Sequence, residues 1–222
     1  MTAVVFDFDG VLVDTEPLHL RAFQEAFAVR GWVLGADAYV DRYLGYDDRD
    51  LLRTYALDHG LTLDDAAFEE ILAIKGAMFE RALSPDGVLY PGAAACVRRL
   101  AARFPLGIAS GSLHREIDGI LARAGLRDPF RVIVGTDDVA RSKPAPDSYT
   151  RAAELLRADP RRSVAIEDSP WGLAAAAAAG FRTIAVTTTS ARDTLRAADR
   201  IVDSLDELTL DLVAELAGPA TP

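Results

Sequence analysis

The chain has little of what disulfide scaffolds, membrane spans and nucleic-acid surfaces are made of. It contains 1 cysteine in 222 residues, which excludes an internal disulfide and a cysteine-rich zinc site, and we expect Cys96 to be a buried apolar side chain. Its longest purely apolar run, residues 173–179, is far shorter than the ~18 residues of a membrane-spanning helix. Lys and Arg number 24 against 34 Asp and Glu, so binding to nucleic acid is disfavoured. We expect a cytoplasmic monomer that binds neither nucleic acid nor a membrane.

The composition is that of a globular protein. Hydrophobic residues make up 50% of the chain, and the 16 Gly and 11 Pro are too few for a collagenous, fibrous or disordered class. At ~150 residues per domain, the length predicts one large domain or one domain with an insertion. A net charge of -10 also means that an anionic substrate would need a bound cation beside it.

Short apolar runs that are typical of buried strands recur along the chain. They occupy residues 3–8, 106–109, 132–134, 164–166 and 183–186. Helical patterns lie between the later runs, and Gly125 and Gly180 stand where helices are expected to end. This alternation predicts an α/β fold with a parallel sheet that is covered by helices on both faces.

The interval between the first two strand-like runs is about 90 residues long and has helical patterns of its own. The apolar positions that carry these patterns are Leu20, Phe23, Phe27, Phe68, Ile71, Leu72, Met78 and Phe79. We predict an inserted all-helical cap at residues 15–86, with a return hinge at Pro85 to Gly87, and a core made of residues 1–14 and 87–222.

Polar side chains follow several of the predicted strands at the point where each ends. Asp7-Phe8-Asp9-Gly10 follows the first, Ser110-Gly111-Ser112 the second and Glu167-Asp168-Ser169 the fourth, and Lys143 lies in a loop before a later helix. Ligands of an open parallel sheet bind beyond the carboxyl ends of its strands, so these groups are expected to converge. Clustered carboxylates repel one another unless a cation lies among them, and oxygen ligands without His or Cys select Mg²⁺. Glu167 and Asp168 are the expected ligands on the far side.

This set of residues predicts phosphoryl transfer. A carboxylate beside Mg²⁺ can attack phosphorus, and a second can protonate the leaving oxygen and later activate water. Gly10 lets the backbone turn, while Ser110, Lys143 and backbone N–H groups would surround the phosphoryl oxygens. Taken singly, an Asp at a strand end is more often a turn former than a nucleophile, and Lys143 would more often be a surface lysine than a catalytic one. The ordered set is what favours catalysis.

The set resembles the haloacid dehalogenase superfamily, with Asp7 to Thr15 matching its first motif, Ser110 its second, Lys143 its third and Ile166 to Ser169 its fourth. The resemblance implies a Rossmann-like core with a helical cap and Asp7 as nucleophile. It also implies that Asp9 is the general acid and base, and that Mg²⁺ is held by Asp7, the Asp9 carbonyl and Asp168. The dehalogenase branch lacks the second Asp of the first motif, so Asp9 indicates phosphoryl transfer.

Residues 14–19 are similar to the branch that contains beta-phosphoglucomutase and sugar-phosphate phosphatases. In that branch a lysine at the position of Lys75 faces the active site, although Lys75 on an apolar helical stripe could also snorkel. His19 could lie over Asp9 or on a helix surface. The residues expected to contact substrate are Gly10, Thr15, His19, Arg49, Lys75, Gly111, Ser112 and His114.

The choice between phosphatase and mutase depends on a second phosphate site. The mutase pattern has a Lys-Asn pair where this chain has Leu113-His114, and its cap arginine aligns with Arg49 only after a one-residue offset. Water is therefore the favoured acceptor, and we expect a Mg²⁺-dependent phosphatase of a small phosphorylated metabolite. A phospho-receiver domain or a non-catalytic binding protein is a less favoured alternative, and no G-x-x-x-x-G-K-[ST] loop supports a kinase.

Overall fold

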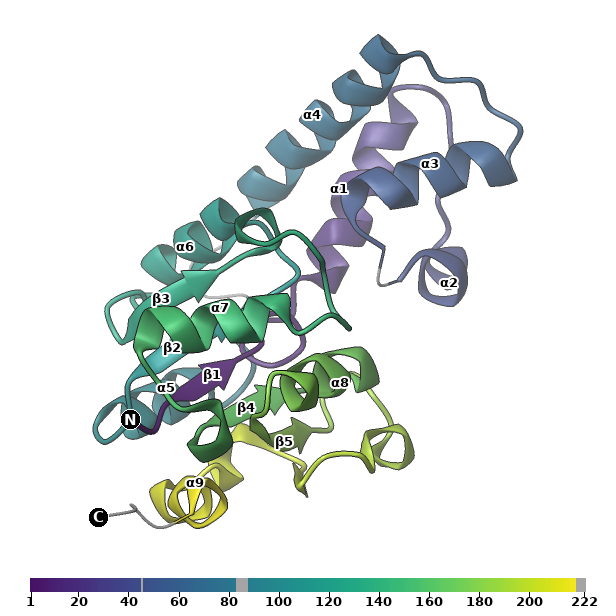
Figure 1. Ribbon diagram of the computed structural model, residues 1–222. Helices are drawn as coiled ribbons and strands as arrows, with labels where there is room; N and C mark the ends of the chain where they lie inside the picture. The colour runs from purple at the N-terminus through teal and green to yellow at the C-terminus, as the bar shows by residue number, and fades with distance from the viewer. Residues whose placement is uncertain (45, 83–87, 219–222) are drawn as a thin grey trace. The chain divides into compact units, whose positions relative to one another are not determined.

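The computed structural model describes residues 1–44, 46–82 and 88–218. Its contacts divide the chain into a core unit, Met1–Asp14 with Pro85–Pro222, and a helical unit, Thr15–Ser84 (Figure 1). The hinge predicted at Pro85 to Gly87 lies outside the described residues. No helix among the described residues is long and apolar enough to cross a membrane.

The core unit is built on a parallel sheet of 6 strands in the order β3-β2-β1-β4-β5-β6. The strands are β1 Val4–Phe6, β2 Leu106–Ala109, β3 Phe130–Val134, β4 Val164–Glu167, β5 Arg182–Val186 and β6 Arg200–Val202. The α/β fold predicted from the alternating pattern is thus confirmed. Sequence reasoning missed β6, because of its 3 residues only Val202 is buried and no apolar run marks it.

Helices follow the strands of the core unit: α5 Ala93–Ala101, α6 His114–Arg123, α7 Asp147–Leu156, α8 Pro170–Ala178 and α9 Leu210–Ala217. One buried cluster joins Val5, Ala109 and Ala165 of the sheet to Tyr149 of α7 and Ala175 of α8. Two helices therefore pack on the same sheet face, and the small side chain of Ala175 lets α8 approach closely. Cys96 is fully buried and unpaired, as predicted.

The helical unit comprises α1 Glu16–Ala28, α2 Ala36–Ala38, a π-helix at Tyr39–Tyr43, α3 Asp48–Asp58 and α4 Asp65–Ala82. Phe23 and Phe27 of α1 pack with Leu52 of α3 and Ile71 of α4 in one apolar cluster. The eight predicted apolar positions are buried (Phe23, Phe27, Ile71, Phe79) or half-buried (Leu20, Phe68, Leu72, Met78), in agreement with the predicted helical stripes. Lys75 is the exception on its stripe, a charged side chain that is only 1% exposed.

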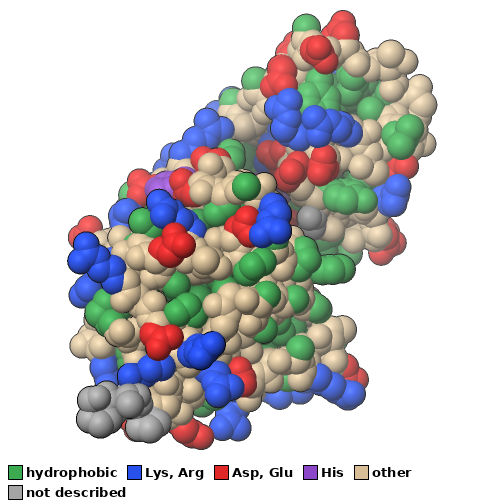
Figure 2. All heavy atoms as spheres, in the orientation of Figure 1, with side chains coloured by type: hydrophobic (Ala, Val, Ile, Leu, Met, Phe, Trp, Pro, Cys, Tyr) green, Lys and Arg blue, Asp and Glu red, His purple; other side chains and the backbone are tan. Residues whose placement is uncertain are grey.

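Charges on the surface are mixed rather than segregated. On the face of the molecule in Figure 2, Lys and Arg side chains lie among Asp and Glu, and no broad basic area interrupts that face. Exposed ion pairs such as Arg192 with Asp203 and Arg196 with Asp193 also put opposite charges side by side on the surface.

Candidate active site

The candidate nucleophile lies where β1 gives way to a tight turn. The Oδ1 atom of Asp7 accepts a hydrogen bond of 2.7 Å from the Phe8 N–H, and the Leu12 N–H donates back to the Phe8 carbonyl at 2.9 Å. Gly10 has φ +76, a left-handed conformation that favours glycine. A Cβ atom there would lie 2.1 Å from Oδ2 of Asp168, so the turn and the carboxylate can meet only because residue 10 has no side chain.

One lysine joins the end of β1 to the end of β4. The Nζ atom of Lys143 lies 2.8 Å from Oδ1 of Asp7 and 2.7 Å from Oε1 of Glu167. The Tyr149 hydroxyl of α7 donates to the same Glu167 oxygen at 2.7 Å. The structure therefore brings together side chains from three segments that are far apart in the sequence, as expected for the carboxyl edge of a parallel sheet.

Asp7, Glu167 and Asp168 each offer an oxygen atom, and these oxygens lie within 4.8 Å of one another. Oε1 of Glu167 is held by Lys143 and Tyr149, and Oε2 accepts from the Ser169 hydroxyl at 3.3 Å and the Asp168 N–H at 3.2 Å. Glu167 is thus placed to hold Lys143. Asp7 and Asp168 are better placed to supply metal ligands, and the predicted metal contact of Glu167 stays a prediction.

Burial and mutual repulsion govern the charges of this cluster. Burial raises the pKa of Asp7 well above its ordinary value, Glu167 adds to the rise and Lys143 opposes it. Burial, with a further contribution from Glu167, raises the pKa of Asp168 to about 6. Burial alone would lower the pKa of Lys143, but Asp7 and Glu167 outweigh it and raise the pKa. Three carboxylates against one ammonium leave an excess of negative charge, which a small divalent cation with oxygen ligands, Mg²⁺, fits.

Asp9 is held by the loop that follows β2. The hydroxyl groups of Ser110 and Ser112 donate to Oδ2 of Asp9 at 3.4 and 2.5 Å. The Ser112 N–H in turn donates to the Ser110 hydroxyl oxygen at 3.0 Å, while Gly111 between them is exposed. The loop that carries Ser110, the predicted second motif, therefore contacts Asp9, which is the second carboxylate of the first motif.

His114 lies away from these contacts, at the start of α6. Its Nδ1 atom is 2.7 Å from Oδ2 of Asp138, and its N–H donates to Asp137 at 2.8 Å. The pairing with Asp138 accounts for the position of the His114 ring without a ligand, and substrate binding by His114 stays a prediction.

A second polar cluster lies in the helical unit. The Nζ atom of Lys75 is 2.6 and 2.7 Å from the two carboxylate oxygens of Asp48 and 2.8 Å from Nδ1 of His19. Burial, with the charge of Lys75, lowers the pKa of His19 to about 3, so its ring is neutral and Nδ1 accepts the hydrogen bond. Lys75 therefore does not snorkel. Sequence reasoning missed Asp48, although a buried lysine requires a carboxylate partner.

The other candidates of the helical unit have structural partners. Arg49 makes a bidentate pair with Glu69, at 2.5 and 3.2 Å, and its guanidinium lies 5.1 Å from the centre of the Phe68 ring. Thr15 is buried immediately before α1. Substrate contacts by Arg49 and Thr15 stay predictions.

A sequence profile described as haloacid dehalogenase-like hydrolase matches residues 1–180. The chain belongs to this family. It is similar to the protein CbbY from Cereibacter sphaeroides, with 37% identity over 235 residues that cover 97% of this chain and 99% of CbbY. It is also similar to fructose-1-phosphate phosphatase YqaB from Escherichia coli, with 28% identity over 82% of this chain and 95% of YqaB. The crystal structure of CbbY from Rhodobacter sphaeroides in complex with xylulose-(1,5)bisphosphate has a TM-score of 0.84 at 30% identity and covers 95% of this chain and 98% of that chain. The family resemblance predicted from the motifs is confirmed.

Sequence reasoning about this haloacid dehalogenase-like hydrolase missed the loop that follows β5. The Thr188 hydroxyl donates to the Gly10 carbonyl, and the Thr189 hydroxyl donates to Oδ2 of Asp168. The available signal was the position of the threonines, directly after a strand and at the same sheet edge as the other motifs.

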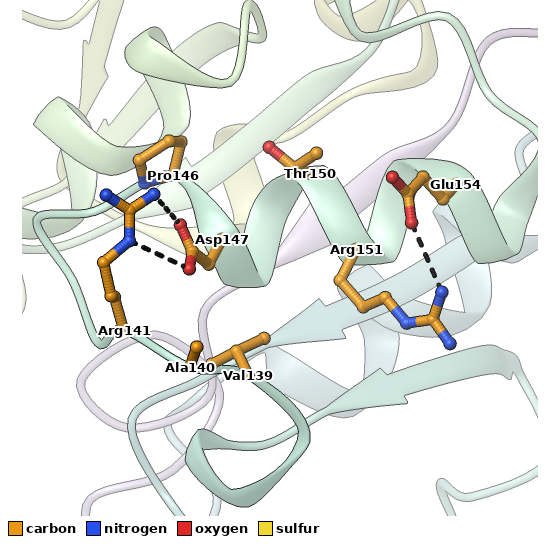
Figure 3. Close-up of a pocket in the computed structure, with 8 residues that line it drawn as sticks. All are labelled: Val139, Ala140, Arg141, Pro146, Asp147, Thr150, Arg151 and Glu154. Atoms are coloured by element: carbon orange, nitrogen blue, oxygen red, sulfur yellow. Dashed lines mark hydrogen bonds and ion pairs between the residues drawn. The ribbon is translucent and has the colours of Figure 1, made fainter.

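The pocket in Figure 3 lies elsewhere in the core unit of the hydrolase, along α7. Its arginines are already paired, Arg141 with Asp147 at 2.7 and 3.1 Å and Arg151 with Glu154 at 3.2 Å. None of the acidic residues at the ends of β1 and β4 lines it. The cluster around Asp7 therefore stays the candidate active site, separate from this pocket.

Proposed function

We propose that this hydrolase is a Mg²⁺-dependent phosphatase that acts on a small phosphorylated metabolite, a sugar phosphate, through an aspartyl-phosphate on Asp7. The observation that carries the proposal is the joint arrangement of Asp7, Lys143 and Asp168 at the carboxyl ends of adjacent strands. It supports the proposal because phosphoryl transfer requires a group to attack phosphorus and neutralisation of the phosphoryl charge, and we assign these roles to Asp7, to Lys143 and to a cation on Asp168.

The proposed reaction has two steps. An oxygen of Asp7 attacks phosphorus, the bond from phosphorus to the substrate oxygen breaks, and Asp9 donates a proton to that oxygen. Asp9 then takes a proton from water, whose oxygen attacks phosphorus, and the bond from Asp7 to phosphorus breaks to release inorganic phosphate. Lys143 and the Ser110 hydroxyl stabilise the charge on the phosphoryl oxygens.

Mg²⁺, when bound by Asp7 and Asp168, would supply further charge neutralisation at the phosphoryl group. The fit rests on the excess negative charge of the buried carboxylates and on the 4.8 Å spread of their oxygens. Gly10 supports it, because only glycine leaves room for the Asp168 carboxylate beside the turn.

The pairing of the chain's own cations favours water over a sugar hydroxyl as acceptor. A beta-phosphoglucomutase-type reaction must hold the second phosphate of a bisphosphate intermediate. The three side chains that are candidates for that task each have a carboxylate partner: Lys75 has Asp48, Arg49 has Glu69 and His114 has Asp138. A second phosphate would have to displace one of these carboxylates, so transfer to water is favoured.

The names of the relatives support a sugar phosphate as substrate. YqaB is named for fructose 1-phosphate, and the CbbY structure contains a xylulose bisphosphate. His19 and Lys75 are the proposed contacts to the sugar. Because Asp48 neutralises Lys75 and His19 is uncharged, these residues favour a hydroxyl-bearing group over a second anion.

Product analysis tests the proposal. A panel of sugar monophosphates, assayed with Mg²⁺ and with EDTA, should release inorganic phosphate only with Mg²⁺ and in step with substrate loss. A hexose 1-phosphate given with a trace of bisphosphate separates the alternatives, because a mutase would form the 6-phosphate with almost no phosphate release. That result, or full activity in EDTA, would overturn the proposal.

A further inference from the structure

The loop after β5 carries three consecutive threonines whose hydroxyl groups go to three different segments. Thr187 donates to Oδ1 of Asp203 after β6, at 2.8 Å. Thr188 donates to the Gly10 carbonyl in the turn after β1, and Thr189 donates to Oδ2 of Asp168 after β4. Two of the three hydroxyl groups therefore end on the candidate active site, although none of the motifs includes this loop.

These two bonds fix groups that already touch. Oδ2 of Asp168 lies against the backbone of Gly10, where a Cβ atom would be 2.1 Å away. The Thr189 hydroxyl donates to this same Oδ2 atom, and the Thr188 hydroxyl donates to the carbonyl of Gly10. A shift of the β5 loop would therefore move the Asp168 carboxylate and the Gly10 turn together.

Threonine suits such a role better than serine. Its branched Cβ restricts χ1, so a threonine hydroxyl is aimed by the backbone with less rotamer freedom than a serine hydroxyl. Thr188 is half-buried and Thr189 is exposed, so burial of the methyl groups does not by itself explain both residues.

We propose that Thr188 and Thr189 are positioning residues, which set the Asp168 carboxylate and the Gly10 turn in the geometry that metal binding and attack by Asp7 require. The inference rests in part on the proposed function, because Asp168 is taken to be a metal ligand. Hydrogen bonds to metal ligands fix their orientation, and their loss commonly weakens metal binding by ~10- to 100-fold. A merely structural hydroxyl would lower thermal stability without changing metal affinity.

The three threonines provide their own control. Thr189→Val removes the hydroxyl at nearly constant volume, Thr189→Ser keeps it, and Thr187→Val removes a hydroxyl of the same loop that does not reach the site. Mg²⁺ binding to the metal-free proteins is measured by titration calorimetry, alongside kcat, KM and melting temperature. We expect Thr189→Val to weaken Mg²⁺ binding by about 10-fold, Thr189→Ser to restore most of it, and Thr187→Val to bind Mg²⁺ as the wild type does.

Thr188→Val should lower kcat with little change in Mg²⁺ affinity, because its partner is the Gly10 carbonyl and not a carboxylate. Equal Mg²⁺ affinity of Thr189→Val and Thr187→Val would overturn the inference, even if both variants melt at a lower temperature. If Thr189→Val does not fold, weaker Mg²⁺ binding by Thr189→Ser than by Thr187→Val supports the inference, and equal binding overturns it. If Thr189→Val weakens Mg²⁺ binding but the wild type hydrolyses no phosphate ester, the positioning role is upheld and the proposed phosphatase function is refuted.

Discussion

At the scale of single residues, the site depends on charges that are close together and out of water. Lys143 is the positive charge that holds both Asp7 and Glu167, and Glu167 is fully buried. Removing one partner of a buried pair costs far more than the pair itself contributes, because the remaining charge has neither water nor a partner. The residues to which we assign the chemistry should therefore also contribute to folding.

The first prediction concerns the two carboxylates after β1. Asp7→Asn should abolish turnover, since an amide oxygen is a poor nucleophile, while Asp9→Asn should slow it by roughly 10²- to 10⁴-fold, the usual effect of general acid and base catalysis. Steady-state phosphate release measures the activity of both variants. In the wild type, acid quench during turnover of a labelled substrate should trap labelled phosphate on Asp7. More than a few per cent of activity in Asp7→Asn would contradict the covalent step.

The second prediction separates the role of Lys143 in folding from that of surface charges. Lys143→Met leaves Asp7 and Glu167 facing each other without a cation, so we expect a loss of ~3–5 kcal/mol in the free energy of unfolding. Urea denaturation of the metal-free protein measures it. Arg151→Met, which removes only the exposed pair with Glu154, should change the free energy by less than ~1 kcal/mol. Similar changes in the two variants would show that the buried lysine is not structurally required.

At the scale of elements, the fold was easier to predict than the contacts within the site. Apolar runs found all five strands from β1 to β5, although the run at residues 132–134 gave only part of β3, because buried parallel strands are continuous apolar segments. The strand β6 was missed because it lies at the sheet edge and only one of its 3 residues is buried. Asp48, Thr188 and Thr189 were missed for another reason: their partners are distant in sequence, and the place of a residue after a strand or at the start of a helix does not say which partner it has.

The packing of α8 on β4 gives an element-scale prediction. Gly172 lies in the first turn of α8, and a Cβ atom there would be 1.9 Å from Oε1 of Glu167. Gly172→Ala should push α8 away from the strand and cost ~1–3 kcal/mol, the usual effect of overpacking. It should also lower activity, because Glu167 holds Lys143. Urea unfolding and phosphate release measure the two effects.

The control for this substitution is Gly119→Ala in α6. A Cβ atom there has no neighbour within 4 Å, so the change should stabilise the protein by up to ~1 kcal/mol through helix propensity alone. Equal stability of the two alanine variants would contradict the close approach of α8 to Glu167.

At the scale of the whole molecule, the strand order explains why distant residues meet. The strands β1 and β4 are neighbours at the centre of the sheet, with Phe6 opposite Ile166, although most of the chain separates them. The chain proceeds outward from β1 to β3 on one side and from β4 to β6 on the other, so the strand order reverses between β1 and β4, the point at which open α/β sheets bind ligands. Asp7 and Asp168 lie at that switch point, so the proposed metal binding would depend on the folded sheet.

The last prediction follows from this coupling of folding, protons and metal. Burial raises the pKa of Asp168 from 3.8 to about 6 in the metal-free fold. A carboxylate with a raised folded pKa stabilises the fold fully below its unfolded pKa and loses that contribution as the pH rises through the folded pKa. Without metal, the contribution of Asp168 should therefore decline between about pH 4 and pH 7, and Asp7 adds to the decline in the same direction.

Mg²⁺ binds the ionised carboxylates, so the stabilisation that it gives should grow over this same range of pH. Melting temperatures of the wild type in EDTA and in Mg²⁺, measured at intervals from about pH 4.5 to about pH 7.5, should diverge as the pH rises. In Asp168→Asn the two curves should stay close together, because the variant has lost both a titrating group and a metal ligand. Parallel curves for the wild type would mean that the cation does not bind at the buried carboxylates, and would remove the electrostatic basis of the proposed site.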